Sequence, residues 1–95
     1  MFRIKKVFEN KETSIYKVEG KITDDNLGAW SEEILKLKQI SNRDVVLDFC
    51  QTWFMSRQAI EALSHETPER FLFANCPMDM RNTLQSVGFS ARVLE

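Results

Sequence analysis

Few side chains of this chain carry the reactive chemistry that catalysis or metal binding requires. His65 is the only histidine among the 95 residues, and no cysteine or serine nucleophile is matched to it. It lies near the expected end of a helix, where a cation is favoured, so a structural role fits it better. One histidine and two distant cysteines make no recognisable ligand set. The sequence therefore predicts no catalytic residue, no metal site and no cofactor.

The two cysteines, Cys50 and Cys76, each follow a predicted strand. If these strands are parallel neighbours, the two thiols could approach each other at one edge of the sheet. A redox pair is conceivable, but the CxxC spacing that supports such chemistry is missing. The alternative is two reduced thiols that pack as small apolar groups. Comparing alkylation rates in the native protein and in urea distinguishes the two interpretations.

The segment around residues 53–60 has the composition of a recognition surface. Trp53 and Phe54 are adjacent aromatics that cannot easily both face a core, and exposed aromatics beside an arginine often anchor interfaces. Arg57 stands at a helix start, where a cation is unfavourable, and local rules are broken most often at functional or strained sites. We expect Trp53 to be exposed, or else to pack on the edge of the first helix. We expect Arg57 to contact an acidic group or anion, or else to reach into water. The predicted partner-binding residues are Trp53, Met55, Ser56, Arg57, Gln58 and Ile60.

Charge and hydropathy exclude several classes of function. Thirteen basic and fourteen acidic residues give a net charge of −1, with no like-charge block, so a nucleic-acid partner is not indicated. No apolar run approaches the roughly 20 residues that cross a bilayer, and the charged stretch 1–6 does not resemble a signal peptide. We therefore expect one cytoplasmic domain over residues 1–95, without membrane insertion.

The first half of the chain predicts a hairpin followed by a helix. Strands are expected at 2–8, with Phe2, Ile4 and Phe8 on one face, and at 13–19. The short polar connection favours an antiparallel pair. Thr23 and the acids after it supply capping chemistry for a helix that runs to about Ile40. Its apolar stripe is Leu27, Trp30, Ile34 and Leu37.

The second half alternates apolar strands with helices. The run Val45–Phe49 suggests a strand covered on both faces, followed by a loop over 50–56 and a second strand at 71–74. The tail, 90–95, is expected to form a short edge segment or a loose end. Ser56 is expected to cap the second helix, and Gly88 the third. The inward residues of these helices are Ala59, Ile60 and Leu63, and Met80, Leu84 and Val87. The predicted fold is an α/β single domain with a mixed sheet of about four strands and three helices, in the order β-β-α-β-α-β-α.

Three stretches in register resemble the STAS family, which includes the anti-sigma factor antagonists. The stretch 45–63 contains Asp48 and Phe54-Met55, which match the family's strand aspartate and apolar pair. The resemblance implies that Phe54 is buried. The stretch 18–23 resembles the approach to its first helix, and 73–89 its last strand and helix. The resemblance implies a STAS-like fold. It also implies that a protein partner docks through the loop 50–57 and the start of the second helix.

The departure from the family lies in the turn that carries its phosphorylated serine. Aligned from Asp48 without a gap, Arg57 takes the position of that serine and Ser56 stands one residue earlier. The resemblance therefore implies a degenerate motif in which phosphorylation is doubtful, with Ser56 as the possible phosphosite. Family partners are serine kinases of the anti-sigma type. The alternatives are the ATPase of an ABC-type membrane transport system, or a nucleotide or lipid ligand. Homodimerisation through sheet edges is possible.

Overall fold

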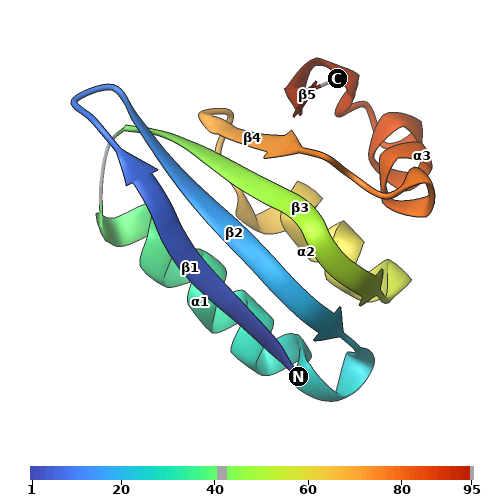
Figure 1. The fold of residues 1–95 in the computed structure, drawn as a ribbon. Coiled ribbons are helices and arrows are strands. Elements are labelled where there is room, and N and C mark those ends of the chain that lie inside the picture. The colour runs from blue at the N-terminus through green and yellow to red at the C-terminus, as the bar shows by residue number, and fades with distance from the viewer. Residues whose placement is uncertain (41–42, 95) are drawn as a thin grey trace.

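A computed structural model describes residues 1–40 and 43–94. Its elements are β1 (Phe2–Glu9), β2 (Thr13–Ile22), α1 (Leu27–Ile40), β3 (Asp44–Met55), α2 (Arg57–Glu66), β4 (Phe71–Ala74), α3 (Met78–Ser86) and β5 (Val93–Leu94), with 3-10 turns at Asp24–Asn26 and Ser90–Arg92. The strands form one sheet in the order β1-β2-β3-β4-β5 (Figure 1). β1 and β2 are antiparallel, and the other neighbours are parallel. The predicted order of elements is confirmed as far as α3.

The sheet has five strands, so the expectation of about four is corrected. β5 consists of two residues, Val93 and Leu94, which pair with Phe73 and Ala74 of β4. A strand this short has no room for the alternation that reveals strands in a sequence. β5 forms because the chain, after α3, comes back beside β4 and pairs with it.

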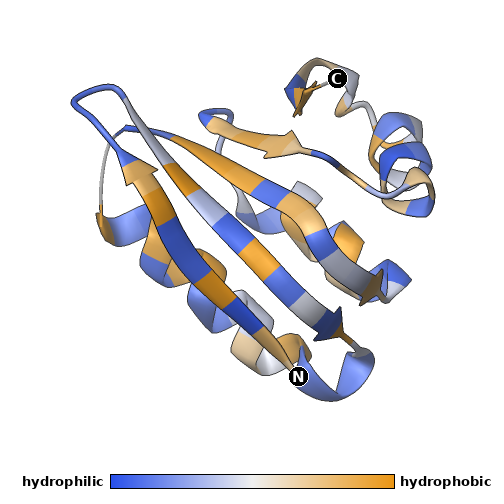
Figure 2. Ribbon diagram, in the orientation of Figure 1, coloured by the Kyte–Doolittle hydropathy of each residue, from blue (hydrophilic) through white to orange (hydrophobic). Residues whose placement is uncertain are grey.

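Helices α1 and α2 lie on one face of the sheet (Figure 1), and the buried side chains of the strands point toward them. Along β3, Val45, Leu47 and Phe49 are buried, whereas Val46 and Asp48 are only half-buried. The prediction that this run is covered on both faces is therefore wrong. The buried residues of β2 are Ser14, Tyr16, Val18 and Ile22, so the core face of this strand mixes the hydrophilic and hydrophobic bands drawn in Figure 2.

A bulge in β1 changes the face of Phe8. The ladder to β2 slips between Lys6 and Phe8, which places Phe8 opposite Ile15, on the face away from the core. An extra residue in one strand reverses the side-chain alternation beyond it. Phe8 is accordingly exposed, and the prediction that it shares a face with Phe2 and Ile4 is wrong.

The predicted stripe of α1 is the side that packs on the sheet and on α2. Trp30, Ile34 and Leu37 are buried, and Leu27 packs partly against the core. The indole of Trp30 donates a hydrogen bond to the carbonyl oxygen of Ala59 at 3.1 Å. This bond ties α1 to the first turn of α2, because a buried indole N–H needs an acceptor.

The end of α3 confirms the cap predicted from Gly88. Gly88 has a φ of 88°. Its amide bonds the carbonyl of Gln85 at 3.1 Å, and the amide of Phe89 bonds that of Leu84 at 2.9 Å, which is the Schellman pattern. Because the helix stops at Ser86, Val87 lies past the apolar stripe and is exposed, contrary to prediction. Among the described helices, none is long and apolar enough to cross a membrane.

Candidate functional site

The strand β3 continues through the segment expected to be a loop. Its ladder to β2 reaches Met55, which pairs with Ile22. The ladder slips twice, and each slip adds an extra residue to β3: one between Asp48 and Gln51, and the other at Trp53. These bulges break the alternation along β3, which is why residues 50–56 look irregular in the sequence.

The second bulge turns two aromatic side chains outward together. Thr52 is buried and donates its hydroxyl to the carbonyl oxygen of Val18 at 2.8 Å. Trp53 is 78% exposed and Phe54 is 51% exposed. The expected exposure of Trp53 is confirmed, and its packing on α1 is excluded. The expected burial of Phe54 is wrong, because the bulge places it on the outer side.

Ser56 joins the end of β3 to the start of α2. Its amide donates to the carbonyl oxygen of Ile22 at 2.9 Å, and so continues the ladder. Its hydroxyl accepts a hydrogen bond from the amide of Ala59 at 3.1 Å. The predicted helix cap is therefore confirmed, and it satisfies an amide that has no partner within the helix.

Arg57 extends outward from the first turn of α2. Its Nε lies 3.2 Å from Oε2 of Glu61, one helical turn further on. The order of the two charges is the weaker one for such a pair, because arginine stands at the positive end of the helix. Its side chain is 79% exposed, so the pair leaves guanidinium donors open to an acidic group.

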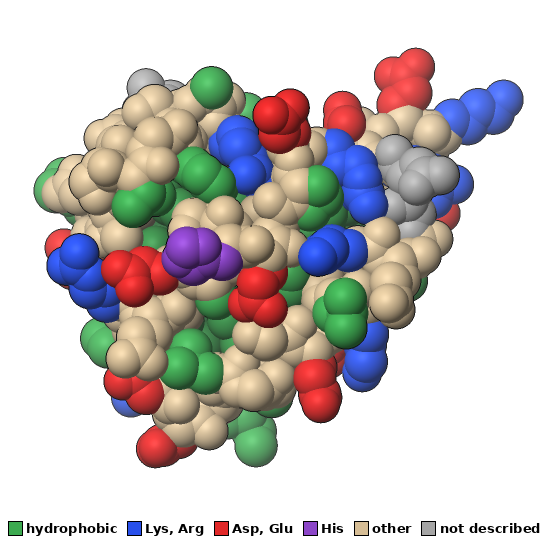
Figure 3. Space-filling view, turned by 180° about the vertical axis from the view of Figure 1, so that it is seen from behind, with side chains coloured by type: hydrophobic (Ala, Val, Ile, Leu, Met, Phe, Trp, Pro, Cys, Tyr) green, Lys and Arg blue, Asp and Glu red, His purple; other side chains and the backbone are tan. Residues whose placement is uncertain are grey.

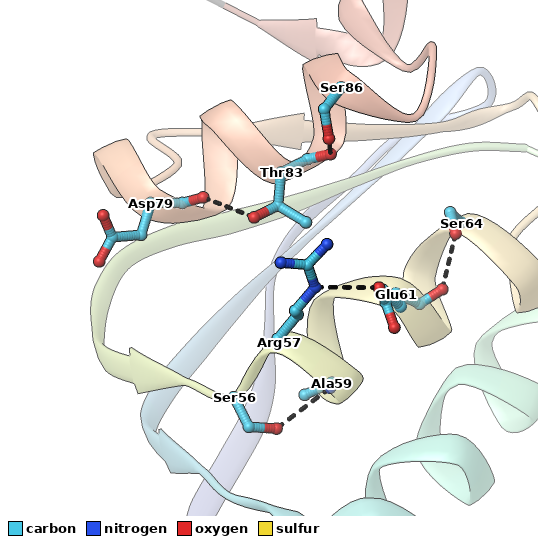
Figure 4. A network of polar contacts seen from close by, with 8 residues as sticks. All are labelled: Ser56, Arg57, Ala59, Glu61, Ser64, Asp79, Thr83 and Ser86. Carbon is cyan, nitrogen blue, oxygen red and sulfur yellow. Dashed lines mark hydrogen bonds and ion pairs between the residues drawn. The ribbon is translucent and has the colours of Figure 1, made fainter.

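Beside these residues lies a groove of about 380 Å³ between the end of β3, α2 and α3. Figure 4 shows Arg57 reaching into the space between α2 and α3, with Asp79 and Thr83 on the opposite wall. The groove combines apolar and polar walls, as surfaces that bind protein side chains do. Its lining is Phe54, Met55, Arg57, Ile60, Asp79, Asn82 and Thr83.

Three of the six predicted site residues, Met55, Arg57 and Ile60, line this groove together. Trp53 and Gln58 are exposed outside its lining, and Ser56 serves as the cap. The wall that α3 contributes was not predicted from the sequence. Asp79, Asn82 and Thr83 have the spacing of one helical face, a signal that was available. Nothing local in the sequence states that this face meets α2.

A second polar cluster fixes the turn that leads into α3. Asp48 accepts hydrogen bonds from the amide of Cys50 and from the side chain of Asn75, each at 2.9 Å. Asn75 has a φ of 55°, a conformation that asparagine tolerates better than most residues. The pKa of Asp48 lies below its ordinary value. Partial burial acts to raise this pKa, but the hydrogen bonds from Asn75 and Cys50 stabilise the carboxylate and outweigh the effect of burial. The cluster thereby links β3 to the start of α3.

The remaining candidates for chemistry lie apart from the groove. Cys50 is exposed, so it does not pack as a small apolar group as expected, whereas Cys76 is buried. His65 is exposed near the end of α2. Within residues 1–40 and 43–94, no three His, Cys, Asp or Glu side chains gather as a metal site would require. On the helix-covered side, charged side chains of both signs are interspersed (Figure 3).

Comparison with known proteins establishes the fold. No protein-family model matches the sequence, and no curated protein matches it. The anti-sigma factor antagonist SpoIIAA in its unphosphorylated form is similar in structure, with a TM-score of 0.72 and 12% identity over 97% of this chain and 86% of that one. The Bacillus cell fate determinant SpoIIAA in the phosphorylated form has a TM-score of 0.72 and 13% identity, over 97% and 89%. An uncharacterised Shewanella loihica protein with a SpoIIAA-like fold has a TM-score of 0.55 and 13% identity, over 99% and 86%. The chain therefore has the SpoIIAA-like, STAS-type fold that its sequence resemblance implied.

Proposed function

We propose that this protein is a non-catalytic interaction module that binds a partner protein at the end of β3 and the start of α2. The observation that carries the proposal is the exposed aromatic pair Trp53 and Phe54, displayed by a bulge on a rigid strand beside the groove. Tryptophan and arginine are the residues most enriched at the energetic centres of interfaces. Trp53 and Arg57 stand on the two sides of the cap at Ser56.

Fold similarity supports the choice of partner. Two structural neighbours are SpoIIAA, described in its unphosphorylated form as an anti-sigma factor antagonist and in its phosphorylated form as a Bacillus cell fate determinant. In line with the family resemblance, we propose a serine kinase of the anti-sigma type as the partner of this chain. Arg57 has no hydroxyl to receive phosphate, and the Ser56 hydroxyl is already used as a cap. Because the position of the phosphorylated serine holds Arg57, we propose that the interaction does not depend on phosphorylation at that position.

The test is a binding titration with the partner that co-purifies with the native protein. Trp53→Ala is expected to weaken binding by at least 2 kcal/mol, or about thirtyfold, as truncation of an interface anchor does. Leu35→Ala is the matched control, because Leu35 is also an exposed apolar residue but lies on α1. Equal affinities of the two variants would contradict the proposed surface.

The identity of the partner separates the alternatives. Recovery of a kinase with a sigma regulator supports the proposal. Recovery of a transporter ATPase contradicts the proposed class of partner, and Trp53→Ala then tests whether that ATPase binds the proposed surface. A nucleotide that raises the melting temperature and is turned over by the protein would overturn the non-catalytic assignment.

A further inference from the structure

The outer edge of β1 carries backbone groups that no described strand pairs. β1 is the first strand of the sheet and has only β2 as a neighbour. The carbonyl oxygen of Met1 accepts a hydrogen bond from the amide of Lys21 at 3.0 Å. Met1 and Lys21 therefore form a hydrogen-bonded pair at the start of the β1–β2 ladder. Opposed pairs alternate between bonded and non-bonded along an antiparallel ladder. The N–H and C=O groups of Phe2, Ile4 and Lys6 therefore point away from β2.

A groove runs beside this edge, between β1 and α1. Its volume is about 490 Å³, and its floor includes Phe2 and Ile4, which are packed partly against the core. The far wall is formed by Ala29 and Glu33, which lie four residues apart on α1, and by Asn26 of the preceding 3-10 turn. A strand added to β1 would place alternate side chains over this groove.

The other face of β1 has an unbalanced positive charge. Lys5 stands directly opposite Lys17 on β2, and like charges in that position are destabilising. Arg3 is paired with Glu19 at 2.6 Å. In the described part of the chain, no acidic side chain forms an ion pair with Lys5. An acidic residue on an added strand would supply the missing partner.

We propose that the β1 edge binds an extended segment of a partner protein in which apolar and acidic residues alternate. The segment adds to the sheet beside Phe2–Lys6, with its apolar side chains over the groove and its acidic ones beside Lys5. Backbone pairing supplies affinity and the alternate side chains supply specificity, as in other cases of strand addition. A second copy of this chain fits poorly, because it would bring the basic residues Arg3, Lys5 and Lys6 of two β1 strands together and the bulge at Val7 bends the strand. The edge lies at the other end of the sheet order from β4 and the helix that follows it, so this surface is separate from the groove between α2 and α3.

The test uses a blocked seven-residue peptide that alternates glutamate and valine, with a lysine–valine peptide and a scrambled peptide as comparisons. In two-dimensional NMR, the glutamate–valine peptide is expected to shift the amides of Phe2, Ile4 and Lys6 and to slow their hydrogen exchange. Amides around Arg57 are expected to stay unchanged. Absence of shifts at millimolar peptide, equal binding of the lysine–valine peptide, or shifts confined to α2 and α3 would overturn the proposal.

Two pairs of variants locate the interaction. Lys6→Pro removes an outward amide at a position where an edge strand tolerates proline. This variant is expected to bind the glutamate–valine peptide about fivefold more weakly than Lys6→Ala, which keeps the amide. Lys5→Glu is expected to weaken binding about fivefold, whereas Arg57→Glu leaves it unchanged. Equal binding within either pair contradicts the assigned geometry. A concentration-dependent dimer that Lys6→Pro dissociates would replace the acidic partner with a second copy.

Discussion

Replacement of Arg92 with alanine is expected to lower the unfolding free energy by about 3 kcal/mol. Arg92 lies where β5 is too short to cover β4, and its side chain takes over the missing pairing. Its Nε donates to the carbonyl oxygen of Phe71 at 2.9 Å. Its Nη2 donates to the Thr67 hydroxyl at 2.7 Å and to the Pro68 carbonyl oxygen at 2.6 Å.

The magnitude follows from these contacts and from two aromatic rings. The guanidinium carbon lies 4.5 Å from the ring centroid of Phe89 and 5.1 Å from that of Phe73. Each cation–π contact contributes about 0.5 kcal/mol at a partly exposed site. Three charge-assisted bonds that share one partly exposed side chain add about 2 kcal/mol in total. The sum is a large fraction of the roughly 5–15 kcal/mol that stabilise a domain, and corresponds to a fall in Tm of about 12–24 °C.

The assay is urea denaturation followed by tryptophan fluorescence, in which the buried Trp30 is expected to supply most of the change on unfolding because Trp53 is already exposed. Arg57→Ala is the matched control, because it removes an exposed surface ion pair and should change stability by about 0.5 kcal/mol or less. Arg92→Lys is expected to lose about 2 kcal/mol, because an ammonium keeps the charge but not the planar fork. If Arg92→Ala were as stable as Arg57→Ala, the role assigned to Arg92 at the sheet edge would be refuted.

Three further outcomes are expected. Gly20→Ala should destabilise the protein by about 2 kcal/mol or more in thermal melts, because Gly20 has a φ of 102° and the added Cβ would lie 2.5 Å from a backbone oxygen. Gly28→Ala in α1 is the control: its added Cβ meets nothing, and it should stabilise the protein by about 0.5 kcal/mol. The folded pKa of Asp48 lies below its unfolded value, so its contribution to stability is present above the unfolded pKa and is lost as the pH falls through the folded pKa. When the urea midpoint is measured against pH, Asp48→Asn should therefore reduce the loss of stability at acidic pH. Cys50 should be alkylated in the native protein well before Cys76, whose burial raises its pKa to about 11; equal rates by mass spectrometry would contradict the structure.

Local interactions explain which features of the fold and site could be predicted. The Ser56 cap and the Gly88 cap depend on residues within five positions of one another, and successive members of the α1 stripe are three or four positions apart, so the sequence carries the full signal. The prediction of a loop over 50–56 was wrong because the conformation of this segment depends on a residue far away in the sequence. Thr52 is held inward by Val18, 34 positions earlier, and no local pattern announces that partner.

The sequence by itself determined the order of the elements as far as α3, the inward stripes of α1 and α2, and the helix caps, because these follow from side-chain periodicity and capping. Only the tertiary structure decided that Phe54 turns outward, that α3 forms one wall of the groove beside Arg57, and that β1 is left with an open edge. These features depend on which strand pairs with which, and in what register. Register is a property of contacts between distant segments, so an irregular stretch such as 50–56 does not by itself distinguish a bulged strand from a loop.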